Sequence, residues 1–144
     1  MTGEIVSIWI KRAHRGVMDP VDDATAIAGR GLVGSADQGR RRQITIIDEA
    51  AWREAASETG FDVDPSKRRA NVMLRGIPLA DSRGKLLRLG TCLVRILGET
   101  RPCERMEEAQ AGLRKALGSN WRAGVFGEIV EGGTIHIGDA AGFV

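Results

Sequence analysis

The chain has 144 residues, of which 42% are hydrophobic and 28% are charged, and its formal net charge is +2. This length and composition predict one globular domain spanning residues 1–144. The small net charge and the 4% of aromatic residues argue against a nucleic-acid-binding surface, so we expect no nucleic-acid partner. There is no apolar run near the roughly 20 residues of a membrane span. Without a signal-peptide core, and with two cysteines that offer no disulfide framework, the chain is expected in the cytoplasm and off the membrane.

The first forty residues predict one long strand followed by irregular chain. Residues 4–10 place Val6, Ile8 and Ile10 on one side, which indicates a strand. Residues 15–23 contain Asp19-Pro20 and predict a loop, and residues 24–28 predict a short extended piece. Residues 29–39 hold four glycines and predict a loop, which is not a phosphate loop because no Gly-Lys-Ser/Thr follows.

The next segment predicts a buried strand followed by a helix. Residues 43–47 are almost continuously apolar, as in a strand buried on both faces. Asp48 is a good N-cap for a helix that Gly60 ends, and its inner stripe begins at Trp52. Asp64-Pro65 predicts one further short turn before the chain becomes extended again.

The second half of the chain is rich in short apolar runs of strand length. Cys92 shares one strand face with Val94 and Ile96, so we expect it in the core. Gly132-Gly133 predicts a hairpin between the last two runs. Many short strands, glycine at the corners and two modest helices predict a mainly β protein, a closed or partly closed β-barrel with a few peripheral helices. The predicted strands cover residues 71–74, 77–80, 85–89, 91–97, 125–130 and 134–137.

Cys103 is the residue with the clearest chemical potential. Met106 and the apolar residues after it recur at helical spacing, which predicts a helix over residues 104–117 with Cys103 at its start. Unpaired backbone N–H groups and the helix dipole favour a thiolate there. A thiolate is a nucleophile, a sulfur acceptor or a soft metal ligand. The alternative interpretation is a small buried apolar residue.

Two basic runs, 40–42 and 67–69, are able to frame one anion site. Arginine suits such a site because its guanidinium makes bidentate contacts with phosphate and carboxylate. The candidates for binding an anionic group are Arg42, Arg69 and Arg101, and Asn71 either donates to a ligand or holds a loop. His14 and His136 have no ligand spacing between them, so a histidine-based zinc site is not expected.

Taken in order, these features resemble those of the MOSC domain, the C-terminal domain of molybdenum cofactor sulfurase, in its small stand-alone form. The resemblance runs from about residue 4 to residue 144. The features that carry it are a glycine-rich loop, Arg42-Gln43 opening a strand, Arg69-x-Asn71, Gly76-x-x-Leu79, Gly90, Pro102-Cys103-x-x-Met106, Gly112-Leu113 and a closing Gly133-x-Ile135-x-Ile137-Gly138-Asp139.

The resemblance implies a barrel like that of pyruvate kinase and a molybdenum cofactor (molybdopterin) or its sulfur handled at Cys103. Arg42, Arg69, Asn71 and Arg101 would contact the cofactor. Similar domains either reduce N-hydroxylated compounds, with the cysteine sulfur bound to molybdenum, or carry sulfur. The first activity would need a separate redox partner and a small-molecule substrate, and the second a pyridoxal-phosphate cysteine desulfurase. The sequence leaves open which of these applies and whether the chain is an enzyme.

One departure concerns the glycine-rich loop. Family members often carry a Gly-Asp-x-His stretch there, whereas this chain has Gly34-Ser35-Ala36-Asp37-Gln38-Gly39. The Asp is displaced and the His is absent, so a role for this loop in cofactor contact or proton delivery does not carry over. Two other functions also remain open. One is a non-catalytic barrel that binds an anionic ligand through its arginines, and the other is a thiol redox sensor at Cys103.

Overall fold

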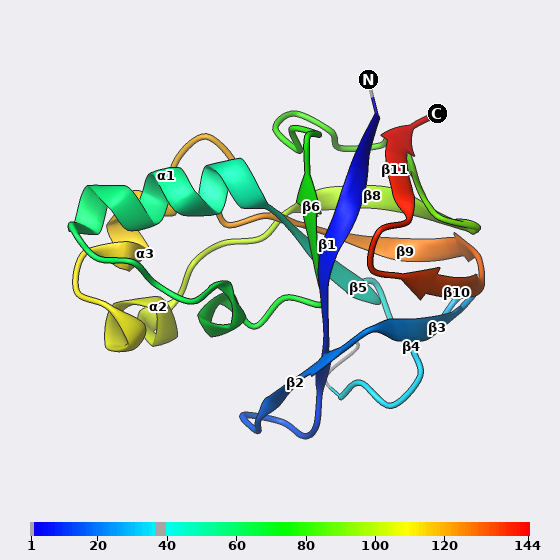
Figure 1. Cartoon of the computed structure of the whole chain (residues 1–144), viewed down its shortest axis with the longest axis horizontal. Coiled ribbons are helices and arrows are strands. Elements are labelled where there is room, and N and C mark those ends of the chain that lie inside the picture. Colours follow the sequence, from blue (N-terminus) through cyan, green and yellow to red (C-terminus); the bar gives the residue numbers. More distant parts are fainter. Residues whose placement is uncertain (1, 37–39) are drawn as a thin grey trace.

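The computed structural model describes residues 2–36 and 40–144 (Figure 1). Its elements in chain order are β1 (Thr2–Lys11), β2 (Met18–Val21), β3 (Asp23–Ile27), β4 (Gly31–Leu32), β5 (Ile44–Asp48), α1 (Glu49–Thr59), the 3-10 helix η1 (Pro65–Arg68), β6 (Val72–Arg75), β7 (Leu86–Leu89), β8 (Cys92–Glu99), α2 (Glu104–Ala109), α3 (Leu113–Ala116), β9 (Val125–Glu131), β10 (Gly133–His136) and β11 (Ala140–Phe143). None of the helices in this part of the chain is both long and apolar enough to cross a membrane.

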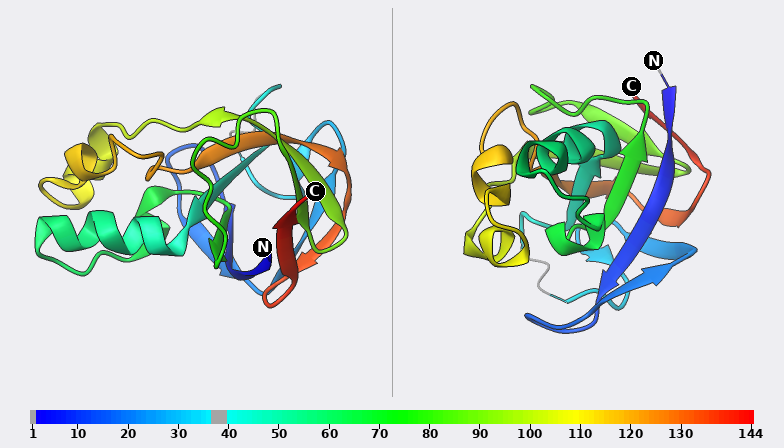
Figure 2. Two further views of the ribbon diagram at one scale, coloured as in Figure 1. Left: turned by 90° about the horizontal axis from the view of Figure 1, so that it is seen from above. Right: turned by 60° about the vertical axis from the view of Figure 1, so that its left-hand side comes forward.

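Seven strands close into a barrel, as the sequence predicts. Hydrogen bonding leads from β1 through β6, β5, β9, β8 and β7 to β11, and β11 pairs back with β1. Neighbouring strands are antiparallel except β5 and β6, which are parallel and are joined through α1 and η1. Figure 2 shows the strands curving around a ring, with the helices gathered beside it. The predicted fold class, a mainly β barrel with peripheral helices, is confirmed.

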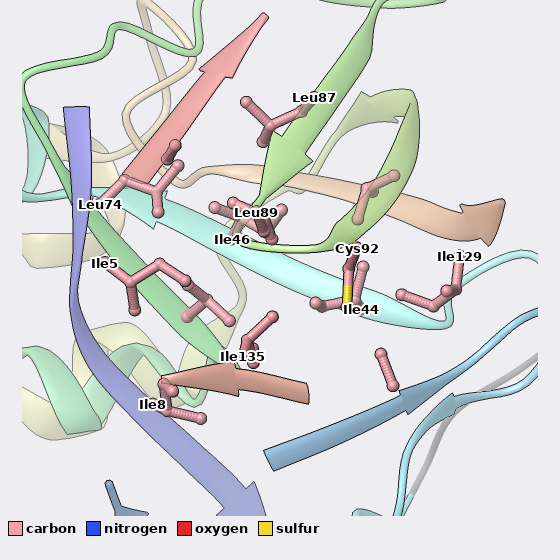
Figure 3. Close-up of a cluster of buried hydrophobic side chains, with 14 of the residues drawn as sticks. Ile5, Ile8, Ile44, Ile46, Leu74, Leu87, Leu89, Cys92, Ile129 and Ile135 are labelled. Carbon is pink, nitrogen blue, oxygen red and sulfur yellow. The ribbon is translucent and has the colours of Figure 1, made fainter. Parts of the chain in front are cut away.

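The barrel interior is filled by aliphatic side chains from alternate positions of these strands (Figure 3). On β5, Ile44 and Ile46 are buried in this core, whereas Thr45 lies on the other face. Cys92 belongs to the same core and is 1% exposed, so its predicted structural role is confirmed. Because the interior is packed with side chains, the barrel has no central channel in which a ligand would bind.

Four local expectations were wrong, each because strand pairing is decided by distant residues. The predicted loop 15–23 contains β2, which becomes a strand by pairing with the end of β1. Residues 77–80 form no strand. The expected hairpin at Gly132-Gly133 does not form, because β10 pairs with β3 in a separate three-stranded sheet with β4. The predicted loop 29–39 contains the two-residue strand β4, and residues 37–39 of it lie outside the described residues.

The helices form a second layer with a core of their own. Asp48 caps α1 by accepting a hydrogen bond from the Ala50 N–H at 3.0 Å, and Gly60 ends the helix with a left-handed φ of 81°. The single helix predicted over 104–117 is instead two short ones, α2 and α3, because the chain is extended at Gln110 and left-handed at Gly112. Side chains from the three helices and nearby loops pack together around Trp52, Met106, Leu113 and Leu117.

Candidate functional site

A cavity of about 530 Å³ lies where the barrel, the helical layer and the β1–β2 hairpin meet. One wall is the outer face of β5 with the segment that leads from η1 into β6, and another is the start of α2. No Asp or Glu is found among the described residues that line it. These residues are Lys11, His14, Ala36, Arg42, Thr45, Ile46, Ile47, Arg68, Arg69, Ala70, Asn71, Thr100, Cys103, Arg105, Met106 and Ala123.

Cys103 lines this cavity and is partly exposed. It is the N-cap residue of α2, with extended backbone dihedrals, and its carbonyl accepts a hydrogen bond from the Met106 N–H at 2.9 Å. The predicted position at the start of a helix is therefore confirmed. However, α2 has only six residues, so its dipole contributes less than the sequence argument assumed. Cationic side chains, among them Arg42, Arg68 and Arg69, line the same cavity.

Arg68 is the most firmly held of these charged groups. Its Nε donates to the Ala123 carbonyl and its Nη2 to Thr100 Oγ1, both at 2.8 Å. Thr100 Oγ1 in turn donates to the same Ala123 carbonyl at 2.7 Å. Burial lowers the pKa of Arg68 to about 10, an effect that Cys103 opposes and Arg42 strengthens. Arg68 is thus still a cation at neutral pH, is fixed by neutral oxygens, and interacts electrostatically with Cys103.

Arg42 and Arg69 reach the cavity from two different segments. Arg42 precedes β5, and its guanidinium lies 5.2 Å from the centre of the Phe126 ring, where a cation–π contact holds it. Arg69 follows η1 with a left-handed φ of 65°, and its Nη1 donates to the Gly16 carbonyl of the β1–β2 hairpin at 2.7 Å. The two basic runs of the sequence therefore meet at one cavity.

Asn71 lines the cavity but uses its side-chain amide within the protein. Its Oδ1 accepts from the Thr45 N–H at 3.0 Å and from Thr45 Oγ1 at 3.2 Å. Its Nδ2 donates to the Trp9 carbonyl and to Ser35 Oγ, each at 3.3 Å. These bonds satisfy the full hydrogen-bonding capacity of an amide. The observed role of Asn71 is to tie β1, β5 and residue 35 together, and direct contact with a cofactor stays a prediction.

Two other sequence candidates lie away from the cavity. Arg101 is exposed and is not among the lining residues, so its predicted contact with a cofactor stays untested. Neither does His136 line the cavity, and the described residues hold no group of three His, Cys, Asp or Glu side chains able to bind a metal ion. The expectation that there is no histidine-based zinc site stays a prediction.

Sequence reasoning did not single out Lys11, His14, Arg68 or Arg105 as cavity residues. Arg68 lies inside the basic run 67–69, so the sequence pointed to the run as a whole and not to this one residue. Both Arg68 and Arg69 of this run line the cavity, and the backbone between them and β6 turns left-handed at Arg69, which nothing in the local sequence specifies. Lys11 and His14 arrive through the β1–β2 hairpin, which the sequence did not predict.

Comparisons with known proteins bear on the family and the fold of the chain. Residues 33–141 match the MOSC domain family, whereas no curated protein matches the chain. The YUAD protein from Bacillus subtilis is similar in structure, with a TM-score of 0.83 and 21% identity over 98% of this chain and 94% of that one. YiiM from Geobacillus stearothermophilus has a TM-score of 0.74 and 18% identity, covering 99% and 75%. YiiM from Escherichia coli has a TM-score of 0.72 and 14% identity, covering 100% and 70%. The family match spans most of the chain, and the chain belongs to the MOSC domain family.

Proposed function

We propose that this chain holds the molybdenum cofactor, or sulfur derived from it, at Cys103. The observation that supports the proposal best is the position of Cys103 in a cavity that it shares with Arg42, Arg68 and Arg69. A sulfur ligand and several cations in one cavity suit a ligand that combines a soft metal or sulfur atom with an anionic tail.

The residues present fit a molybdopterin group. The cavity, about 530 Å³, is within the range of roughly 300–1,000 Å³ that is common for small-molecule and cofactor sites. Cys103 would bind the metal or accept the sulfur, and Arg42, Arg68 and Arg69 would bind the phosphate. When bound, the group supplies a redox-active metal and exchangeable sulfur. The chain itself would orient this group, because Thr100 and the Ala123 carbonyl fix Arg68 and because Asn71 fixes the strand at the cavity wall.

Two activities follow from this proposal, and they require different partners. Reduction of N-hydroxylated compounds would need electrons from a separate redox protein. Sulfur transfer would need a pyridoxal-phosphate cysteine desulfurase to load Cys103 with persulfide sulfur. The alternative, a binding module for an anionic ligand, is favoured by the fixed cation at Arg68 and needs no thiol. Replacing Cys103 should therefore abolish reduction and sulfur transfer but leave simple anion binding in place.

The test is metal and pterin analysis of protein purified from a host that makes molybdenum cofactor. We compare wild type with Cys103→Ser, and with Cys92→Ala as a control that alters a buried cysteine outside the cavity. The proposal predicts molybdenum and pterin near one per chain, or persulfide on Cys103, in wild type and in the control, with loss in Cys103→Ser. Ligand retained fully in Cys103→Ser would favour the binding module, and absence of both molybdenum and persulfide from wild type would refute the proposal.

A further inference from the structure

A second cavity, of about 430 Å³, lies between α1, the chain that follows it and β6. The 3-10 helix η1 contributes Pro65 to this cavity and Arg68 to the Cys103 cavity, yet the described residues that line the two share no member. The volume is within the range of roughly 300–1,000 Å³ that is common for small-molecule sites. Much of the lining is apolar, and its apolar members are Trp52, Ala56, Phe61, Val63, Pro65 and Met73.

The floor of this second cavity is built from buried side chains. Trp52 is 2% exposed, and its indole Nε1 donates to the Val63 carbonyl at 2.9 Å, which fixes the chain after α1 against the helix. Ala56 of α1 and Met73 of β6 are also buried. Because packed elements of the fold form the floor, the cavity needs no rearrangement to receive an apolar group.

Phe61 lies at the mouth of this cavity and is 61% exposed. The chain has three phenylalanines, and the other two each face a cation: Arg42 lies 5.2 Å from the Phe126 ring centre and Lys85 lies 5.6 Å from that of Phe143. No Lys or Arg among the described residues lies over the ring of Phe61 in this way. The face of an aromatic ring attracts cations, so Phe61 offers an unused cation–π surface to a ligand.

The charged side chains around the same cavity leave one carboxylate in excess. Glu49 and Arg53 both line it, and Glu49 pairs with Arg53 at 3.4 Å and with Arg75 at 2.8 Å. Arg75 also pairs with Glu4 at 3.4 Å, so these four charges cancel. Asp62 lines the cavity too, but its carboxylate makes no hydrogen bond or ion pair within the part of the chain that the structure describes. The cavity therefore carries one uncompensated negative charge.

An apolar floor, an unused ring face and an unpaired carboxylate together specify the chemistry of a ligand. We propose that this cavity is a binding site for a small organic ammonium ion with an aromatic body. The body packs on Trp52 and its apolar neighbours, and the ammonium group lies at the mouth between Phe61 and Asp62. An anion of the same shape is repelled by Asp62. The proposal does not depend on Cys103 or on the proposed function.

Three probes with the same indole body and different charge test this site. Tryptamine carries an ammonium group, tryptophol a neutral hydroxyl and indoleacetate a carboxylate. Binding is measured by titration of the nitrogen-labelled chain in proton–nitrogen NMR spectra. The indole N–H resonance of Trp52 reports on the cavity floor, and that of Trp121, which is not among the lining residues, is the reference.

We expect tryptamine to bind wild type about fivefold more tightly than tryptophol, because it adds one cation–π contact and one solvent-exposed ion pair. Indoleacetate should bind more weakly than tryptophol. The advantage of tryptamine should shrink as salt is added, since salt screens an exposed pair. All three probes should shift the Trp52 resonance and leave that of Trp121 in place.

Variants separate the contribution of the carboxylate from that of the ring. Asp62→Asn should remove most of the preference for tryptamine and leave the affinity for tryptophol unchanged. Phe61→Leu keeps an apolar side chain but lacks the ring face, so it should lower the preference as well. Asp81→Asn is the matched control, because Asp81 is exposed and outside the cavity and the variant loses the same charge. It should leave all three affinities unchanged.

Equal affinities of wild type for tryptamine and tryptophol would overturn the proposal, and so would a preference that Asp62→Asn retains in full. Shifts that spare Trp52 and appear elsewhere would also overturn it, since the probes would then bind at another place. Cys103→Ser should bind tryptamine as wild type does. A failure of this test would therefore leave the molybdenum and persulfide analysis intact, and a failure of that analysis would leave the ammonium site standing.

Discussion

The two cysteines of this chain lie eleven positions apart but in opposite surroundings. Cys92 is 1% exposed in the barrel core, where burial raises the pKa of its thiol. Cys103 is partly exposed in a cavity whose described lining carries several cations. The same side chain is thus a packing residue in one place and a candidate for chemistry in the other. We conclude that the barrel interior serves as the scaffold, and that the functional site lies where loops and the helical layer meet the outer face of the barrel.

Strand β5 shows the same contrast between a side that packs in the core and a side that faces the cavity. Ile44 and Ile46 fill the barrel core, while Thr45 between them faces the cavity and bonds to Asn71. Alternation along a strand therefore gives one face to stability and the other to the site. Both faces depend on the closed barrel, because β5 is held by β9 on one side and by β6 on the other.

The contrast between the cysteines should appear first in their reactivity. In the native protein we expect iodoacetamide to label Cys103 faster than Cys92 by at least on the order of a thousandfold, because labelling of Cys92 requires opening of the core. Peptide mass spectrometry over a time course measures both rates, and denatured protein provides the reference. Comparable rates in the folded state would show that the barrel interior is open and would remove the contrast.

The two faces of β5 should respond differently to mutation. Ile44→Ala removes buried aliphatic volume and should cost about 2–5 kcal/mol of unfolding free energy. Thr45→Val keeps the volume but loses the hydroxyl bonds to Asn71, and should cost about 1 kcal/mol. Urea denaturation measures both. An equal loss of unfolding free energy in the two variants would contradict the assignment of one face of β5 to the core and the other to the site.

Gly124 lies between Ala123, which lines the cavity, and Val125, which begins strand β9 of the barrel. Its φ is +103°, and an added Cβ would lie 2.4 Å from the Ile46 carbonyl oxygen. Gly124→Ala should therefore cost about 2–4 kcal/mol through strain and forced displacement. Gly84→Ala is the matched control, because Gly84 has a φ of +82° with nothing within 4 Å of the added atom. It should cost about 1 kcal/mol, and a similar loss for both would rule out the clash as the cause.

The smallest expected effect is a pH dependence on the outer surface. Hydrogen bonding to Arg75 lowers the pKa of Glu49 below its ordinary 4.5. The stabilisation is therefore complete above about pH 4.5 and is lost as pH falls through the lowered pKa. Because the Arg75 side chain is 55% exposed, water screens the pair and the effect should be small. Arg75→Gln should flatten this part of the curve in thermal unfolding between pH 3 and 6, and an unchanged curve would show that the pair contributes nothing.

The elements that could be predicted are those whose signals are local. The helix from Asp48 to Gly60 carries its own cap and stop, and the strands around Ile46 and Val94 carry continuous apolar runs. Strand β2 was missed because Asp19-Pro20 is typical of a turn, and only pairing with the end of β1 makes it extended. Strand β11 has the sequence Ala-Ala-Gly-Phe, which is a strand because it closes the barrel between β1 and β7.

The candidate site divides in the same way. Cys103 and the two basic runs could be found from the sequence, since a proline before a helix start and clustered arginines are visible in the residues themselves. The identity of the fixed arginine could not be found. Arg68 is selected by Thr100 and the Ala123 carbonyl, from segments 32 and 55 residues away, and no local pattern records that pairing.

The central claim is that the cofactor or its sulfur is held at Cys103 in the arginine-lined cavity. The most direct measurement is a crystal structure of protein purified from a cofactor-making host, with anomalous diffraction collected at the molybdenum edge and at a wavelength sensitive to sulfur. The account predicts a molybdenum peak, or the second sulfur of a persulfide, next to Cys103 Sγ. A molybdenum peak elsewhere in the molecule, or neither signal at Cys103, would contradict it.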